Sequence, residues 1–335
     1  MSSEKELMGF IGSADFDKVD NIKNLIEEGV DINYVFQKAE QVDNLWFSRT
    51  PLMECIITAG ISQSEEDFEV FELLTENGAD MKITDESGNT PALIAVRYFA
   101  LDILRFLVQQ GANIHDQNTA EENAFDIIIA RYEEEREELG EEDVNDKGEA
   151  FERMLERIDA IVENGYDLSA GKYPATECAL LNISENRLPA ETLIYLFDKG
   201  ADPRGYVNPE EGTPFPLLEA AFCNNLPDEE LVAMIGKIGV EYVYEQYVES
   251  TPLLLAVHNQ NEVVIKNLIS SGADVHIQND RALRVACDTG NLEIVKYLVG
   301  HGAIINATDL RGDNSVALAE KLGFTDIVAF LKSKL

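Results

Sequence analysis

The chain has 335 residues, of which 45% are hydrophobic and 27% charged, a balance that excludes wholesale disorder. Its 26 basic and 63 acidic residues give a formal net charge of -37, a field that repels nucleic acid and anionic membranes. This length is large for a single core, so we expect either two globular domains or one array of small repeats.

The first residues, 1–6, precede no apolar stretch resembling a signal peptide, and no apolar run is long enough to span a bilayer. We therefore expect a cytoplasmic protein. The four cysteines, Cys55, Cys178, Cys223 and Cys287, lie far apart without a C-x-x-C pair. We expect reduced, buried thiols and neither a zinc site nor a disulfide framework.

A glycine phrase recurs along the chain: an apolar helical segment ends in glycine, usually followed by a small residue and then Asp or Asn. Its copies lie at Gly29, Gly78, Gly111, Gly165, Gly200, Gly272 and Gly302, with a diverged copy at Gly239. Successive glycines are 49, 33, 54, 35, 39, 33 and 30 residues apart. This spacing indicates a repeat of about 33 residues with two insertions. Each glycine is expected to end a helix in a left-handed conformation.

A second phrase opens the repeat units, with Thr50, Thr90 and Thr251 each followed by proline. Threonine is expected to cap a helix whose first turn holds the proline, where its missing amide costs nothing. Four residues beyond each proline a small side chain is expected, because neighbouring first helices pack closely. These positions, with Pro174 and Pro216 as prolines of their units, are Cys55, Ala95, Cys178, Ala220, Ala256 and Ala286. A second helix follows, clearest at 291–299.

These phrases resemble the ankyrin family, whose consensus runs G-x-T-P-L-H-x-A, then a second helix, then G-A-D or G-A-N. The resemblance covers nearly the whole chain and implies an all-α repeat solenoid of stacked helix-turn-helix units with projecting β-turn or loop fingers. It implies a single domain, 1–335, with an N-terminal capping unit at 4–32 and a C-terminal capping unit at 313–333. The expected internal units are 50–80, 90–113, 123–167, 173–202, 213–240, 251–274 and 281–304.

The sequence departs from the family consensus in two ways. The histidine after T-P-L is replaced by Met53, Leu93 and Leu254, and 281–283, Arg-Ala-Leu, replaces T-P-L itself. Units with these changes are expected to be less regular and less stable than consensus units.

Two insertions interrupt the repeat. Residues 33–49 lengthen the finger between the first two units, and 131–149 lie between the two helices of the fourth unit. The acidic run 133–149 fails as an EF-hand, because Lys147 stands at a ligand position and Met154 where the bidentate Glu belongs. We expect an extended, solvated helical hairpin on the side away from the fingers.

The resemblance implies that partners bind the finger tips and first helices on a concave face. Aromatic candidates for partner contact are Tyr34, Phe36, Trp46, Phe47, Tyr206, Tyr242, Tyr244 and Tyr247. Acidic candidates that would suit a basic protein surface are Asp85, Glu86, Glu121, Glu122, Glu210 and Glu211. Two alternatives stay open: a long finger that buries its own aromatics, and acidic pairs that only keep the surface soluble.

The sequence contains few residues or motifs that could support catalysis. It has four histidines, no H-E-x-x-H, and no glycine-rich phosphate loop, so we expect no enzyme activity, no metal and no cofactor. The leading hypothesis is a monomeric inhibitor, immunity or sequestering protein that binds a basic partner protein, with nucleic-acid mimicry as one version. Alternatives are an adaptor or host-interaction scaffold that joins two proteins through separable surfaces, and a carboxylate-based hydrolase.

Overall fold

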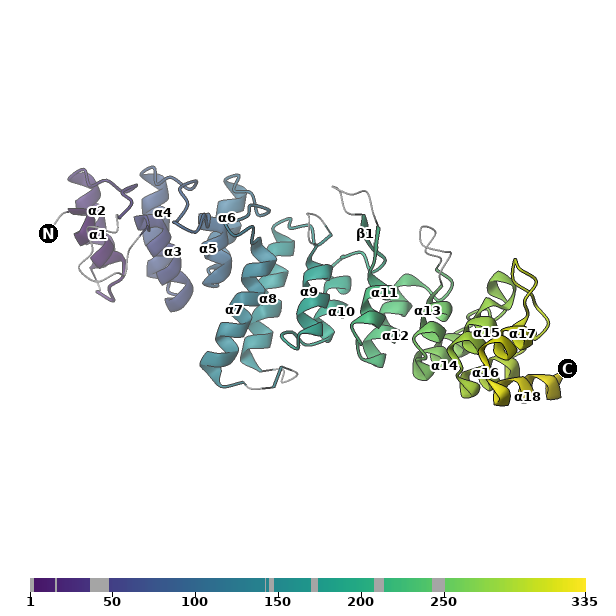
Figure 1. Cartoon of the computed structure of the whole chain (residues 1–335). Coiled ribbons are helices and arrows are strands. Elements are labelled where there is room, and N and C mark those ends of the chain that lie inside the picture. Colours follow the sequence, from purple (N-terminus) through teal and green to yellow (C-terminus); the bar gives the residue numbers. More distant parts are fainter. Residues whose placement is uncertain are drawn as a thin grey trace. The chain divides into compact units, whose positions relative to one another are not determined.

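A computed structural model describes residues 3–15, 17–36, 48–141, 143–144, 148–169, 174–207, 214–242 and 251–335. In these ranges the chain is all-α apart from one short β-ribbon, and consecutive helices pair (Figure 1). The chain divides into two compact units, Met1–Asp167 and Leu168–Leu335, called here the N-terminal and C-terminal units. The predicted stack of helix pairs is confirmed.

The N-terminal unit contains four helix pairs. They are α1 (Ser3–Ile11) with α2 (Lys18–Glu27), α3 (Pro51–Ser62) with α4 (Glu65–Glu76), α5 (Pro91–Arg97) with α6 (Leu101–Gln109), and α7 (Ala124–Leu139) with α8 (Glu149–Glu163). The first helices of the pairs pack in chain order, α1 on α3, α3 on α5 and α5 on α7. Each pair thereby buries the apolar side of its neighbour.

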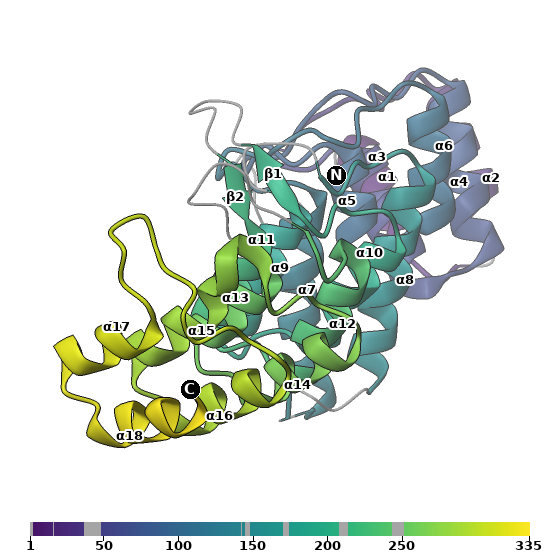
Figure 2. The ribbon, with the colours of Figure 1, turned by 90° about the vertical axis from the view of Figure 1, so that its right-hand side faces the viewer.

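The C-terminal unit continues the same scheme with five pairs in its described residues. They are α9 (Ala175–Ser184) with α10 (Glu191–Asp198), α11 (Leu217–Cys223) with α12 (Asp228–Ile238), α13 (Pro252–His258) with α14 (Glu262–Ser270), α15 (Ile277–Thr289) with α16 (Leu292–Gly300), and α17 (Ser315–Leu322) with α18 (Thr325–Lys334). Before α11, the antiparallel strands β1 (Gly205–Val207) and β2 (Pro214–Pro216) form a ribbon (Figure 2).

The helix ends follow the two predicted phrases. The Thr50 hydroxyl accepts a hydrogen bond from the Met53 amide at 3.2 Å, and the other two T-P phrases cap their helices in the same way. All eight phrase glycines have positive φ, from 87° to 106°. At Gly29 an added Cβ would meet open space, so the backbone conformation itself selects glycine there.

Most of the small-residue positions of the first helices are buried. Cys55 and Ala95 are buried, and burial raises the pKa of the Cys55 thiol above its usual range. Burial likewise raises the pKa of Cys287 to about 12, so both thiols stay protonated and unreactive. The expectation of four buried thiols is wrong at Cys223, which is exposed, and Cys178 is half-buried.

The insertion in the fourth repeat lengthens α7 and α8 into a helical hairpin. The sequence predicts a solvated hairpin, and Glu135 departs from that expectation, because it is buried together with Arg157 of α8. Both oxygens of the Glu135 carboxylate accept hydrogen bonds from Arg157, at 2.8 and 3.0 Å. Arg157 Nε donates to the Val96 carbonyl of α5 at 3.2 Å, so this pair joins the long hairpin to the preceding repeat.

Candidate partner-binding surface

The fingers of the N-terminal unit are joined to one another by hydrogen bonds. Asn33 links the first two, since its amide donates to the Gly78 carbonyl at 3.1 Å and its oxygen accepts from the Asp80 amide at 2.7 Å. Thr119 links the second finger to the third, because its backbone amide and its hydroxyl both donate to the Ser87 carbonyl, at 2.8 and 2.7 Å. We call the fingers 80–89 and 113–122 the finger ladder.

Both fingers of the ladder end in the same five-residue turn, and so does the last finger of the C-terminal unit. The turns span 85–89, 118–122 and 309–313. In each, the side-chain oxygen of the first residue accepts hydrogen bonds from the backbone amides two and four residues later, at 2.8 to 3.0 Å. Such Asx turns hold the tip in one conformation.

The fourth position of this turn is left-handed in all three fingers. It is glycine in two of them, Gly88 with φ 78° and Gly312 with φ 87°. In the finger 118–122 the position is Glu121, with φ 63°. A left-handed conformation costs a residue with a Cβ about 1 kcal/mol or more, so Glu121 is the strained member of the set.

The two acidic pairs of the ladder divide into structural and outward-facing carboxylates. Asp85 is used by its turn, where Oδ2 also accepts a hydrogen bond from the Asn89 amide group at 2.9 Å. Glu122 accepts one from Asn118 at 2.7 Å. Glu86 and Glu121 are exposed at the tips. One carboxylate of each pair, Asp85 or Glu122, therefore makes a hydrogen bond within its own finger, although Glu122 is exposed as well. The other, Glu86 or Glu121, faces solvent at the tip.

Replacing Glu121 by glycine is expected to raise the free energy of unfolding by up to about 1 kcal/mol, because the left-handed strain disappears. Urea unfolding measures this. The matched variant Glu121→Gln keeps the strained backbone and should stay within about 0.5 kcal/mol of the intact chain. A destabilised glycine variant would mean that the side chain supports the finger, contrary to this interpretation.

The remaining predicted contact residues are less well placed or lie outside the described residues. Phe36 is buried, 4% exposed, against the half-buried Tyr34 ring, with centroids 5.0 Å apart. This agrees with the alternative in which the first finger buries its own aromatics. Tyr206 pairs with Phe215 in the β-ribbon, and Tyr242 is half-buried. Trp46, Phe47, Glu210, Glu211, Tyr244 and Tyr247 fall outside the described residues.

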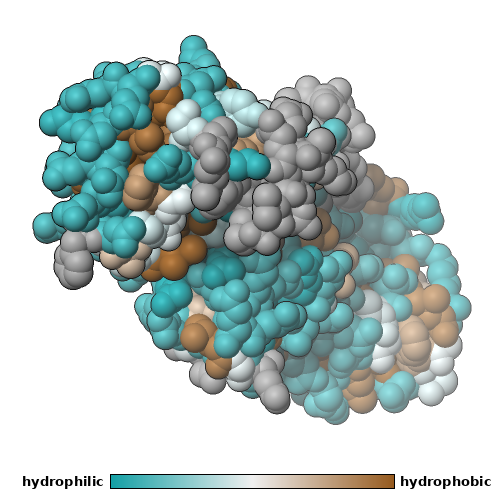
Figure 3. Space-filling view, turned by 90° about the vertical axis from the view of Figure 1, so that its left-hand side faces the viewer, coloured by the Kyte–Doolittle hydropathy of each residue, from teal (hydrophilic) through white to brown (hydrophobic). Residues whose placement is uncertain are grey.

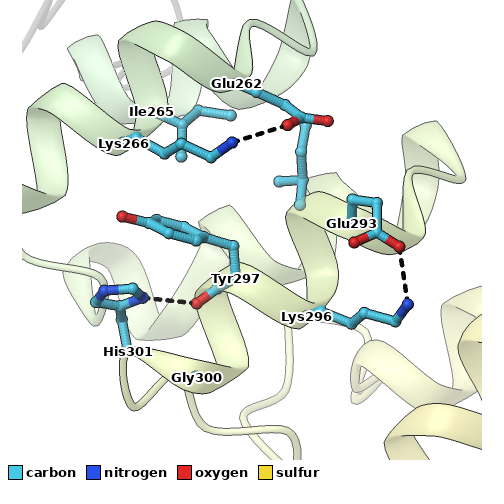
Figure 4. Close-up of a pocket in the computed structure, with 9 residues that line it drawn as sticks. Glu262, Ile265, Lys266, Glu293, Lys296, Tyr297, Gly300 and His301 are labelled. Atoms are coloured by element: carbon cyan, nitrogen blue, oxygen red, sulfur yellow. Dashed lines mark hydrogen bonds and ion pairs between the residues drawn. The ribbon is translucent and has the colours of Figure 1, made fainter.

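The C-terminal unit has a shallow groove between α14 and α16 (Figure 4). Lys266 pairs with Glu262 at 3.0 Å and Lys296 with Glu293 at 2.8 Å, so positive and negative charges alternate along it. The ring of Tyr297 lies against that of His301, with centroids 4.2 Å apart. Exposed ion pairs of this kind contribute little to stability and select no particular charge in a ligand.

The described residues contain no group of three or more His, Cys, Asp or Glu side chains placed to hold a metal ion. None of the described helices combines the length and apolar character needed to cross a membrane.

Stacked helix pairs with fingers linked side by side define a repeat protein that presents its loops as a surface. The chain belongs to the ankyrin-repeat family: the family described as Ankyrin repeats (3 copies) matches residues 10–119, 180–309 and 253–334. Ankyrin repeats are a protein–protein interaction module, and the scaffold is typically non-enzymatic. The predicted family is therefore confirmed.

Two similar proteins are much longer than this chain. The chain is 24% identical over 299 residues to alpha-latroinsectotoxin-Lt1a of Latrodectus tredecimguttatus. This match covers 78% of this chain and 20% of the toxin. It is 26% identical over 323 residues to the transient receptor potential cation channel subfamily A member 1 of Homo sapiens, covering 81% of this chain and 26% of the channel. The chain thus spans about a quarter or less of the length of these relatives.

Proposed function

We propose that the chain binds another protein that carries a basic surface, and that the finger ladder of the N-terminal unit makes the contact. The observation that carries this proposal is Glu121, whose carboxylate stands at a finger tip although its backbone conformation favours glycine. Strain of this kind is concentrated at functional sites. Glu121 and Glu86, which lies on the adjacent finger, together provide two exposed carboxylates on rigid, linked loops.

The charge distribution supports the N-terminal unit as the main contact. Residues 1–167 carry 13 basic and 40 acidic side chains, whereas residues 168–335 carry 13 and 23. A field of this sign accelerates encounter with a cationic partner and weakens as salt is added. Figure 3 shows hydrophilic residues over much of the part nearest the viewer, beside a band of hydrophobic residues.

The role that follows is that of an inhibitor, immunity or sequestering protein which covers a basic surface, with nucleic-acid mimicry as one version. The finger aromatics outside the described residues, with Trp46 first among them, remain predicted contact residues for the same partner. An adaptor that joins two proteins is the second candidate, and it requires a second, separable surface. A cytoplasmic location and a monomeric state belong to this proposal as well.

The test is quantitative capture of partners from the native cell with the intact chain and with Glu86→Gln/Glu121→Gln. Losing two charges at the contact should weaken binding of the captured partner about tenfold, equivalent to about 1.4 kcal/mol. The control Glu262→Gln/Glu293→Gln removes the same charge from the C-terminal unit and should leave binding unchanged. Equal binding by all three chains would contradict the assignment to the finger ladder.

A further inference from the structure

The α3–α4 hairpin reaches past the neighbouring α5–α6 hairpin (Figure 1). Helix α3 has 12 residues and α5 has 7, so the last turn of α3 runs beyond the end of α5. Gly60 makes this possible, because a Cβ at this position would lie 2.0 Å from the Tyr98 carbonyl oxygen. The part of the α3–α4 hairpin that extends beyond α5 forms one side of a groove next to the α5–α6 turn.

The groove runs between α4 and α6 and has a volume of about 870 Å3. Its floor is aromatic. Phe68 from α4 and Phe106 from α6 line it, and both are half-buried. Beneath them the buried Phe71 ring meets Phe106 edge-on, with centroids 5.3 Å apart, and Phe68 at 6.0 Å. Half-exposed aromatic rings on a rigid support are suited to receive apolar side chains.

Carboxylates stand on both edges of the groove. Glu65 is exposed at the start of α4, and Asp102 is exposed at the start of α6. Among the described lining residues the cation is Arg105, which lies 3.7 Å from both Asp102 and Glu163. The lining therefore carries two carboxylates against one cation, in a unit with 13 basic and 40 acidic residues. An occupant needs apolar side chains for the floor and positive charge for the edges.

We propose that this groove is a docking site for a basic amphipathic helix of a partner protein, separate from the finger ladder. A helix is favoured over an extended strand because α4 and α6 satisfy their own backbone groups and offer no free sheet edge for pairing. Helix α6 has 9 residues and is therefore about 14 Å long. That length accommodates about two turns, with two apolar anchors three or four residues apart on Phe68 and Phe106.

The corresponding position in the C-terminal unit shows what this groove would be without those features. The groove between α14 and α16 is smaller, about 350 Å3, and two glutamates and two lysines line its edges (Figure 4). Because Glu262 and Glu293 pair with those lysines, this second site offers no excess of either charge. It provides a control within the same chain.

The experiment measures binding of a fluorescein-labelled synthetic helix of leucine and lysine to the full chain by anisotropy. A peptide of identical composition, scrambled to remove the apolar stripe, is the reference. We expect the amphipathic peptide to bind at least about tenfold more tightly than the scrambled one. Glu65→Lys/Asp102→Lys should weaken the amphipathic peptide at least about tenfold, whereas Glu262→Lys/Glu293→Lys, with the same change in net charge, should alter it less than about twofold.

Equal binding of the two peptides, or equal losses in the two charge-reversed chains, would overturn the proposal and leave only a general electrostatic attraction. Phe68→Ser adds an independent arm, because loss of the aromatic floor should remove the preference for the amphipathic peptide while circular dichroism confirms folding. If that variant unfolds, the exposed charge variants still decide. Glu86→Gln/Glu121→Gln should leave peptide binding unchanged, so failure here and failure of the finger ladder are distinguishable.

Discussion

Glu135→Ala is expected to lower the free energy of unfolding of the N-terminal unit by about 3–5 kcal/mol. The substitution leaves the Arg157 guanidinium charged and only 2% exposed, without the carboxylate that both of its terminal nitrogens contact. Urea unfolding followed by far-UV circular dichroism measures this loss.

The reverse deletion is the control. Arg157→Met should cost less, because Glu135 keeps Arg131 at 3.2 Å and Arg153 at 3.8 Å. The double variant Glu135→Leu/Arg157→Met should recover most of the loss, since it leaves no buried charge unpaired. If Glu135→Ala costs less than about 1 kcal/mol, the pair does not join the long hairpin to α5 as described.

Asp67→Asn is expected to lower the free energy of unfolding by about 3 kcal/mol. The substitution removes the charged partner of the buried Lys18 ammonium, and this ion pair joins α2 to α4. Burial opposes ionisation of Asp67, but hydrogen bonds from Lys18, Ser62 and Ser64 outweigh it, so the pKa of Asp67 lies below its ordinary value of 3.8. A depressed folded-state pKa contributes stability that is fully present above 3.8 and is lost as pH falls through the folded value.

The measurement is urea unfolding of the intact chain and of Asp67→Asn from neutral pH to below 3.8. The stability difference should stay constant above that value and shrink below it. The exposed carboxylate two residues earlier gives the control Glu65→Gln, which should change stability by less than about 0.5 kcal/mol. A difference that grows as the pH falls would contradict the sign of the pKa shift.

The sequence predicted the helix stack because the signals that position its helices are local. Each phrase glycine ends a helix through its own φ, and Thr50 caps α3 through a side chain three residues from its donor. Neither needs a distant residue. The repeat then follows from counting, because identical local signals at similar spacing build similar helix pairs.

The candidate surface was less predictable, because its properties depend on contacts between distant residues. Glu135 belongs to an acidic run that indicates a solvated face, and its burial follows from Arg157, 22 positions further along. The acidic pair at 85–86 gives no sign that Asp85 orders the turn while Glu86 faces solvent. Likewise, the strain at Glu121 becomes visible only when its finger is compared with those that carry glycine.

Hydrogen–deuterium exchange of the chain with and without its captured basic partner tests the central claim most directly, because it locates the contact along the backbone. Binding through the finger ladder predicts slower exchange at 85–89 and 118–122, and the protection should fade as salt is raised. Protection confined to the C-terminal unit, with unchanged exchange in both finger turns, would contradict the account.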